Sequence, residues 1–268
     1  MVDTHCHLDI VVEKKIENFS YKQMLQWYIK RASDRGVSTL VNVGTTVEDS
    51  RKYVDLALQY SHLFAVVGLH PTEVASDWPD KLLQLEPFCM NKKKYKVVGI
   101  GECGIDLFHK NETLNMQKDA FKSHIEYALQ YDLALVVHSR NAYDQTLHIL
   151  EPYVSDLKRV VFHCFSYDKA FSDQVEQWGF LMGIGGPITY PKNQVLRDVF
   201  TSCRETSFVL ETDAPFLPVQ SMRGKQNEPQ HIADIALFIA QLRGVSVDYI
   251  DNITTANAER LFRFSEYT

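Results

Sequence analysis

VDTHCH, residues 2–7, is a short run with β-branched residues that ends in two histidines. Similar apolar or β-branched runs recur along the chain and alternate with longer segments of helical spacing. Eight such runs occur, at residues 2–5, 38–43, 64–68, 96–101, 133–138, 159–163, 180–184 and 208–211. Alternating strands and helices are typical of a parallel sheet, and eight repeats favour closure into a barrel. The sequence therefore predicts an α/β fold of the TIM-like (β/α)8 barrel type.

The length and composition suit one such barrel. The chain has 268 residues, of which 45% are hydrophobic, and barrels of about 250 residues commonly fold as a single domain. We therefore expect one domain over residues 1–268. Helical spacing is clearest at residues 114–131 and 194–203, and residues 247–264 are expected to form an extra helix over the base of the barrel. No apolar run approaches the roughly 18 residues of a membrane span.

The cysteines and the N-terminal sequence favour a cytoplasmic protein. The five cysteines include no CxxC pair, which fits a reducing compartment, and the first residues lack a basic segment followed by an apolar run. Cys6, Cys103 and Cys164 each adjoin a candidate metal ligand. Because successive strand side chains point to opposite faces, we expect these thiols to face away from the ligands as small buried hydrophobes.

The net charge of −6 does not by itself indicate nucleic-acid binding. Four acidic residues expected near the site would, however, lie beside bound cations that offset them. They are Glu102, Asp106, Glu211 and Asp213. The lysines at 92–94 precede the fourth strand and are predicted on the opposite face, as a solvated helix end. Arg140, Arg223 and Lys225 follow the fifth and eighth strands and are predicted on the catalytic face.

Histidines and carboxylates stand at the carboxyl ends of the predicted strands, where barrel enzymes place their chemistry. His5 and His7 are spaced i, i+2 and therefore project to one side of the first strand. An HxH pair alone is a weak signal, but the other candidates occupy matching positions. The six candidate metal ligands are His5, His7, Glu102, His138, His163 and Asp213.

Four imidazoles and two carboxylates exceed the needs of one tetrahedral cation and suit two divalent ions, Mg²⁺, Mn²⁺ or Zn²⁺. Glu102 is the expected bridge between them. His5, His7 and Asp213 are assigned to the first ion, and His138 and His163 to the second. A water bound between the two ions would lose its proton near neutral pH.

Three residues are predicted to assist catalysis. Asp213 is the general-base candidate, because it can bind one ion and accept a proton from water. Glu211 is placed on the same side as Asp213 if the eighth strand continues that far, and would then orient a ligand or a third, weakly held cation. The alternative is that Glu211 is a buried partner of a nearby cation such as Arg140. His70 ends the third strand, and either contacts the substrate phosphate or leaving group or makes only a loop hydrogen bond.

The motifs taken together resemble one known family. They are DTHCHLD, GLHP, GECGID, VVHSR, FHCFS, LETDAPFLP and RGKQNEP, spread from Asp3 to Phe262. This set is similar to the TatD deoxyribonuclease family of the amidohydrolase superfamily. The resemblance implies a metal-dependent hydrolase that acts on DNA, commonly as a 3′ to 5′ exonuclease, with Mg²⁺ or a transition metal. It places the six candidate ligands at metal positions and ties His70 and Glu211 to activity.

The resemblance also frames the remaining expectations. The loop 223–229 resembles a segment near the substrate, and Tyr167 stands where the family often has glycine. DNA, as single strands or 3′ ends, is the expected partner, with no obligate protein partner. One alternative is hydrolysis of a D-aminoacyl-tRNA ester, an amide or a lactone, because the same metal pair can polarise a carbonyl. A catalytically silent metal-binding scaffold is the other.

Overall fold

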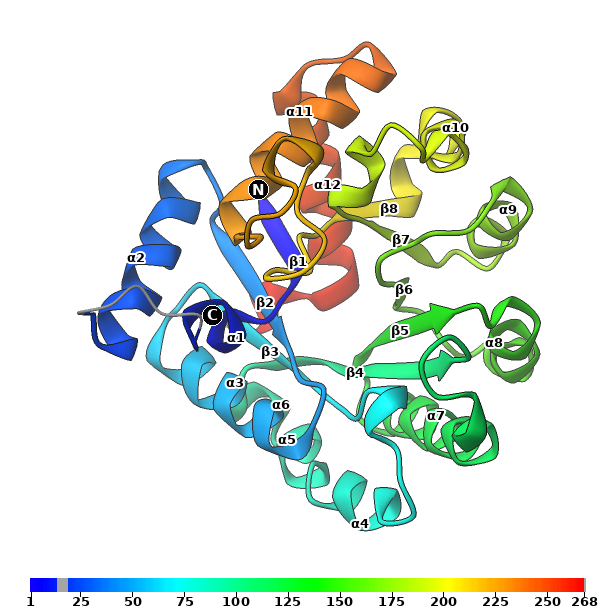
Figure 1. The fold of residues 1–268 in the computed structure, drawn as a ribbon. Helices are drawn as coiled ribbons and strands as arrows, with labels where there is room; N and C mark the ends of the chain where they lie inside the picture. The colour runs from blue at the N-terminus through cyan, green and yellow to red at the C-terminus, as the bar shows by residue number, and fades with distance from the viewer. Residues whose placement is uncertain (14–18, 268) are drawn as a thin grey trace. The chain divides into compact units, whose positions relative to one another are not determined.

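The computed structural model of the chain describes residues 1–13 and 19–267, in which strands alternate with helices (Figure 1). The strands are β1 (Val2–Cys6), β2 (Thr39–Val43), β3 (Leu63–Val67), β4 (Val97–Asp106), β5 (Ala134–Arg140), β6 (Val160–Phe162), β7 (Leu181–Ile184) and β8 (Phe208–Leu210). The helices are α1 (Leu8–Glu13), α2 (Tyr21–Asp34), α3 (Val47–Gln59), α4 (Trp78–Leu83), α5 (Glu86–Met90), α6 (Lys92–Tyr95), α7 (Leu114–Gln130), α8 (Tyr143–Leu150), α9 (Lys169–Gln177), α10 (Gln194–Ser202), α11 (Ile232–Arg243) and α12 (Val247–Phe262).

The strands follow one another in the sheet in sequence order, from β1 to β8. The pairs β1–β2, β3–β4, β4–β5, β5–β6 and β7–β8 are parallel. The segment after β8 returns to β1: Asp213 N donates to His5 O at 2.9 Å, and His7 N donates to Ala214 O at 2.8 Å. This is the topology of a (β/α)8 barrel, as the sequence predicts.

The chain forms two compact units, each assembled from separated segments. One unit consists of Met1–Asn42, Cys164–Gln177 and Met182–Ala258, and it holds β1, β8 and most of β2 and β7. The other consists of Val43–His163, Trp178–Leu181 and Glu259–Thr268, and it holds β3 to β6. Each unit thus carries four strands: β7, β8, β1 and β2 in the first unit, and β3 to β6 in the second. The expectation of a single domain over residues 1–268 stays a prediction.

Strand β4 is longer than the predicted run 96–101 and includes Glu102 and Asp106. Two glycines of this strand allow close packing against its neighbour. A Cβ at Gly101 would collide with Val136 O, and one at Gly104 would collide with His138 O; their φ angles are +135° and +138°. Glycine therefore lets β5 approach β4, with Gly104 paired to His138.

The segments predicted to be helical lie close to their expected places. Residues 114–131 form α7, which packs on β4, and residues 194–203 form α10. The lysines at 92–94 form most of α6, which precedes β4. Lys93 and Lys94 are exposed as predicted, whereas Lys92 is half-buried and its Nζ donates to Tyr131 O at 2.8 Å. Within the described ranges, no helix has both the length and the apolar character needed to cross a bilayer.

Helix α12 covers the amino-terminal ends of the strands, as predicted for the tail. In the first unit, the buried Asn257 amide donates to Glu205 O at 2.7 Å and to Phe208 O at 2.8 Å, at the start of β8. In the second, the Phe264 ring lies 4.6 Å from the Phe64 ring at the start of β3. The tail therefore fixes the end of the strands opposite their carboxyl ends.

We expect Asn257→Ala to lower the free energy of unfolding by about 2 to 4 kcal/mol. The reason is that the backbone carbonyls of Glu205 and Phe208, at the start of β8, would lose their hydrogen-bond donor. Urea denaturation followed by circular dichroism measures this change. The exposed Asn252 on the same helix provides the matched control, and Asn252→Ala should stay within about 0.5 kcal/mol of the unmodified chain. Equal stabilities of the two variants would contradict the proposed role of the tail.

Candidate metal centre

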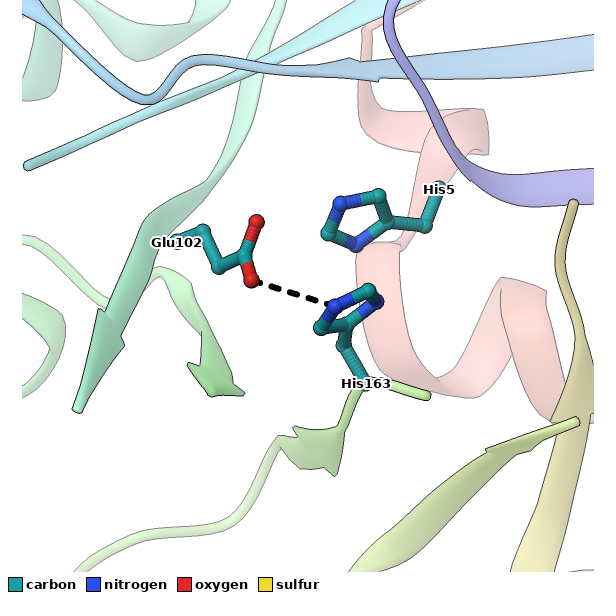
Figure 2. A group of neighbouring side chains, drawn as sticks. All are labelled: His5, Glu102 and His163. Atoms are coloured by element: carbon teal, nitrogen blue, oxygen red, sulfur yellow. Dashed lines mark ion pairs between the residues drawn. The ribbon is translucent and has the colours of Figure 1, made fainter. Parts of the chain in front are cut away.

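The Glu102 carboxylate is the focus of the polar cluster in the second unit. Its Oε1 lies 2.8 Å from His138 Nδ1, 3.1 Å from His163 Nε2 and 3.5 Å from His70 Nε2. Figure 2 shows the ion pair of Glu102 with His163. The Glu102 side chain is 4% exposed, so its charge must be balanced by these neighbours and not by water.

The electrostatics of this cluster favour a carboxylate anion. Burial alone would raise the pKa of Glu102, but the imidazoles of His163, His70 and His138 outweigh burial and hold that pKa well below its ordinary value. Burial alone would likewise lower the pKa of His138, but hydrogen bonds to Asp106 and Glu102 outweigh it and raise that pKa. Positive charge is therefore stabilised between the two carboxylates.

Asp106 is a potential ligand that the sequence prediction did not include. Its Oδ2 lies 3.1 Å from His138 Nε2, and His70, Asp106 and His138 form a group whose ligand atoms lie within 4.8 Å of one another. Hydrogen bonds from His138 and His109 outweigh burial and lower the pKa of Asp106. The signal was available: Asp106 follows Glu102 by four residues on one strand, which places both side chains on the same face.

Two buried residues outside the predicted set hold these ligands in place. Gln117 of α7 accepts from Asp106 N at 2.8 Å and donates to Lys110 O at 2.5 Å, so it fastens the carboxyl end of β4. His124 Nε2 accepts from Leu69 N at 3.1 Å, while its Nδ1 lies 2.7 Å from Ala120 O. No strand-end pattern marks either residue, because both act from a helix.

His70 makes the loop contacts and also faces the cluster. Thr72 N donates to His70 Nδ1 at 3.2 Å, so Nδ1 is an acceptor and the ring proton lies on Nε2, the atom near Glu102 and His138. Burial lowers the pKa of His70 to about 4, which keeps the ring neutral at pH 7. The loop hydrogen bond is present at Nδ1. Contact of Nε2 with the substrate phosphate or leaving group stays a prediction.

In the first unit, His5, His7 and Asp213 come together, with ligand atoms within 4.8 Å of one another. Asp213 Oδ1 lies 3.3 Å from His7 Nε2 and 3.8 Å from His5 Nε2. The two imidazole rings are 5.1 Å apart at an interplanar angle of 74°, so they point at a shared region from one strand end. The i, i+2 spacing of the histidines thus has the predicted consequence.

Asp213 lies beside the two histidines, but strand alternation is not what positions it there. The eighth strand ends at Leu210, and Asp213 has a left-handed backbone with φ +56°, so strand alternation does not align it with Glu211. Instead Asp3 accepts from Thr212 N at 2.9 Å and from Thr212 Oγ1 at 2.6 Å. The buried amide of Asn227 also donates to Thr212 O at 2.8 Å. These contacts fix the segment that presents Asp213.

Glu211 is buried and holds a neighbouring loop. Its Oε1 accepts a hydrogen bond from Cys164 N at 2.6 Å, and Cys164 has a left-handed backbone with φ +45°. A Cβ at Gly183 would collide with Glu211 Oε2, so the glycine makes room for this carboxylate. Glu211 therefore orients the residue that follows His163 in the chain.

The thiols beside the ligands behave as predicted at two of three positions. Cys6 Sγ lies 3.5 Å from Val41 O, and Cys103 Sγ lies 3.6 Å from Val136 O. Burial raises the pKa of both thiols well above the ordinary value, so neither is a thiolate ligand at neutral pH. Cys164 is half-buried, and the role of its thiol stays a prediction.

The predicted substrate-facing residues lie on loops. The Arg223 guanidinium stacks 4.5 Å from the Tyr190 ring centroid, and Lys225 is exposed. Tyr167 packs edge-on against Phe171 at 4.5 Å, which ties its ring to α9. Stacking of a base on Tyr167 stays a prediction.

The donor set fits divalent cations. Each of the groups described above offers imidazole nitrogens and a carboxylate oxygen close together and out of water, which suits Zn²⁺ or Mn²⁺, and the carboxylates also suit Mg²⁺. Buried carboxylates that converge on imidazoles cost free energy unless positive charge accompanies them. Divalent cations therefore fit these residues, and the number and identity of the ions stay a prediction.

The sequence matches the family described as TatD related DNase over residues 2–263. This chain belongs to that family. Among similar proteins of the TatD-related family, the metal-dependent hydrolase YjjV of Escherichia coli K12 is 32% identical over 262 residues, which cover 97% of each chain. The 3′-5′ ssDNA/RNA exonuclease TatD of Shigella flexneri is 30% identical over 239 residues, which cover 87% of this chain and 91% of that one.

Solved structures agree with the family assignment. The crystal structure of E. coli YjjV matches 98% of this chain and 97% of its own with a TM-score of 0.87 and 31% identity. The chain is therefore a metal-dependent hydrolase of the TatD-related family with the TIM-barrel fold. Its substrate is a separate question.

The buried His124 makes a testable contribution to acid sensitivity. Burial lowers its pKa to about 4 in the folded chain, below the ordinary value of about 6.5, so the unfolded chain binds the proton more readily between these pH values. Stability from this group is fully present above pH about 6.5 and declines by up to about 3 kcal/mol as the pH falls toward 4.

We expect His124→Gln, which keeps an acceptor for Leu69 N, to show a smaller loss of stability between pH 7 and pH 5 than the unmodified chain. The midpoint of urea-induced unfolding is measured for both proteins at pH 7 and pH 5, in buffer that contains a metal chelator. An identical pH dependence in both proteins would show that His124 does not titrate as described.

Proposed function

We propose that this TatD-related hydrolase cleaves phosphodiester bonds in DNA, as a 3′ to 5′ exonuclease that uses two divalent ions. The proposed ligands are His5, His7, Glu102, His138, His163 and Asp213. The observation that carries the proposal is the Glu102 carboxylate, which is buried and faces three imidazoles within 3.5 Å. Such a carboxylate would hold divalent cations together with the imidazoles around it.

Two further observations concern the substrate. The family relative named as a 3′-5′ ssDNA/RNA exonuclease supports a nucleic-acid substrate. A carboxylate at position 102 also favours phosphodiester chemistry over amide hydrolysis, where a carboxylated lysine often bridges the metals. A cytoplasmic location and the lack of an obligate protein partner stay predictions.

When bound, a pair of divalent cations stabilises negative charge on phosphoryl oxygens and makes a water molecule easier to deprotonate. Asp213 Oδ1 then serves as the base that accepts the proton of the attacking water. The neutral His70 presents Nε2–H toward the cluster and donates a hydrogen bond to the phosphate or the leaving oxygen. Glu211 positions the loop after His163 through the Cys164 amide. Water and diester become a phosphomonoester and an alcohol.

The substrate class can be tested with labelled oligonucleotides. We expect protein reconstituted with Mg²⁺, Mn²⁺ or Zn²⁺ to shorten 5′-labelled single-stranded DNA stepwise from its 3′ end, and to lose this activity in EDTA. Glu102→Gln should lose metal content and activity together, because the bridging charge is removed. D-aminoacyl-tRNA, amide and lactone substrates serve as controls. Hydrolysis of one of these, with no cleavage of DNA, would overturn the proposal.

We expect Asp213→Asn to keep the fold but reduce kcat on DNA by about 10²-fold or more, since an amide cannot accept the proton. Single-turnover cleavage at saturating metal measures the rate, and metal content is determined in parallel. Asp234, a surface partner of Arg35 at 2.8 Å, provides the control, and Asp234→Asn should cleave normally. Turnover by metal-loaded Asp213→Asn near that of the unmodified enzyme would exclude Asp213 as the base.

A further inference from the structure

The turn after β4 presents an exposed aromatic ring beside the candidate metal centre. Phe108 N and His109 N both donate to Asp106 Oδ1, at 2.9 Å and 2.7 Å. The other oxygen of this carboxylate, Oδ2, lies 3.1 Å from His138 Nε2. Asp106 therefore joins the turn directly to the ligand cluster. Phe108 remains 60% exposed, although its ring contacts the His109 ring edge-on, with the ring centroids 4.7 Å apart.

Arg140 lies against this ring from the neighbouring strand. Its guanidinium carbon is 4.6 Å from the Phe108 ring centroid. Arg140 is the last residue of β5 and pairs in register with Asp106, and Leu107 N donates to Arg140 O at 3.0 Å. The backbone pairing thus keeps the turn that bears Phe108 next to the end of β5.

The Arg140 charge is available for an anion. Across the ranges 1–13 and 19–267, the structure pairs it with no carboxylate, and the side chain is exposed. A guanidinium stacked on a ring keeps its in-plane N–H groups directed outward, which suits two-point contact with a phosphate. An exposed ring beside it suits a nucleobase, because every base has a π-face.

We propose that Phe108 and Arg140 form a stacking platform that holds an unpaired nucleotide next to the cleaved phosphodiester. Phe108 stacks on the base and Arg140 contacts a backbone phosphate. This inference rests on the proposed nuclease function and adds the residues that select single-stranded ends. In a duplex the terminal base is already stacked and paired, so it reaches the platform only after that pairing is broken. Phe108 and Arg140 are positioning residues that contact the substrate away from the reacting atoms.

The platform can be tested by comparing substrates with and without a base. We expect Phe108→Ala to raise KM for a single-stranded oligonucleotide by about tenfold, the scale of one lost stacking contact, with a smaller change in kcat. On an oligonucleotide that is abasic at its last two 3′ positions, the variant and the unmodified enzyme should have equal KM. Bis(p-nitrophenyl) phosphate, a diester without a base, should be hydrolysed equally by both.

Further variants separate stacking from folding. Phe108→Trp should retain the KM of the unmodified enzyme, because it keeps an aromatic face, and it provides the comparison if Phe108→Ala folds poorly. Arg140→Gln should raise KM on the normal and the abasic oligonucleotide alike and reduce the dependence of KM on salt. Tyr95 also lies beside a cation, Lys94 at 4.9 Å, but precedes β4, so Tyr95→Ala is the matched control and should leave KM unchanged.

The outcomes distinguish this inference from the proposed function. If the unmodified enzyme does not cleave DNA, the proposed function fails. If it does, but Phe108→Ala has an unchanged KM on the normal oligonucleotide, the platform alone is refuted. An equal rise in KM on normal and abasic substrates, or an equal loss on bis(p-nitrophenyl) phosphate, would also refute stacking, because a general distortion of the site would explain it.

Discussion

A buried carboxylate surrounded by imidazoles is the constraint on which the site depends. Removing Glu102 from water costs free energy that only nearby positive charge offsets, so the strands must bring histidines to it. Glycine at 101 and 104 allows β5 to approach β4 closely, and the register then sets Gly104 against His138. The glycines of the GECGID motif therefore act on the chemistry through packing, although none of them carries a functional group.

The other group of ligands is controlled by loop contacts and not by strand geometry. Asp213 takes a left-handed backbone, which costs free energy for a residue other than glycine, although aspartate tolerates it better than most. The segment is held by Asp3 on one side and by Asn227 on the other, both through Thr212. Asn227 lies in the loop 223–229, which resembles a family segment near the substrate. That loop therefore braces the segment bearing Asp213 whatever else it contacts.

The sequence predicts the strand order and the meeting of ligands within each unit well, because both follow from short-range rules. The alternation of apolar runs places strands, and parallel strands collect their carboxyl ends at one edge. Prediction is weaker where tertiary contacts override local pattern. Strand β4 continues to Asp106, beyond the predicted end at residue 101, and the end of β8 at Leu210 breaks the alternation assumed for Asp213. Gln117 and His124 were missed because a buried polar residue on a helix has no spacing that reveals its partner.

The positions of the charged groups explain how a chain of net charge −6 could bind the proposed nucleic-acid substrate. Glu102 and Asp106 are engaged by imidazoles, so their negative charge is compensated locally. Arg140 and Arg223 rest on aromatic rings, and among the described residues neither guanidinium is paired with a carboxylate. Stacking orients a guanidinium without neutralising it, whereas an ion pair would do both. A few such arginines provide local attraction for phosphate, and the rest of the surface need not be basic.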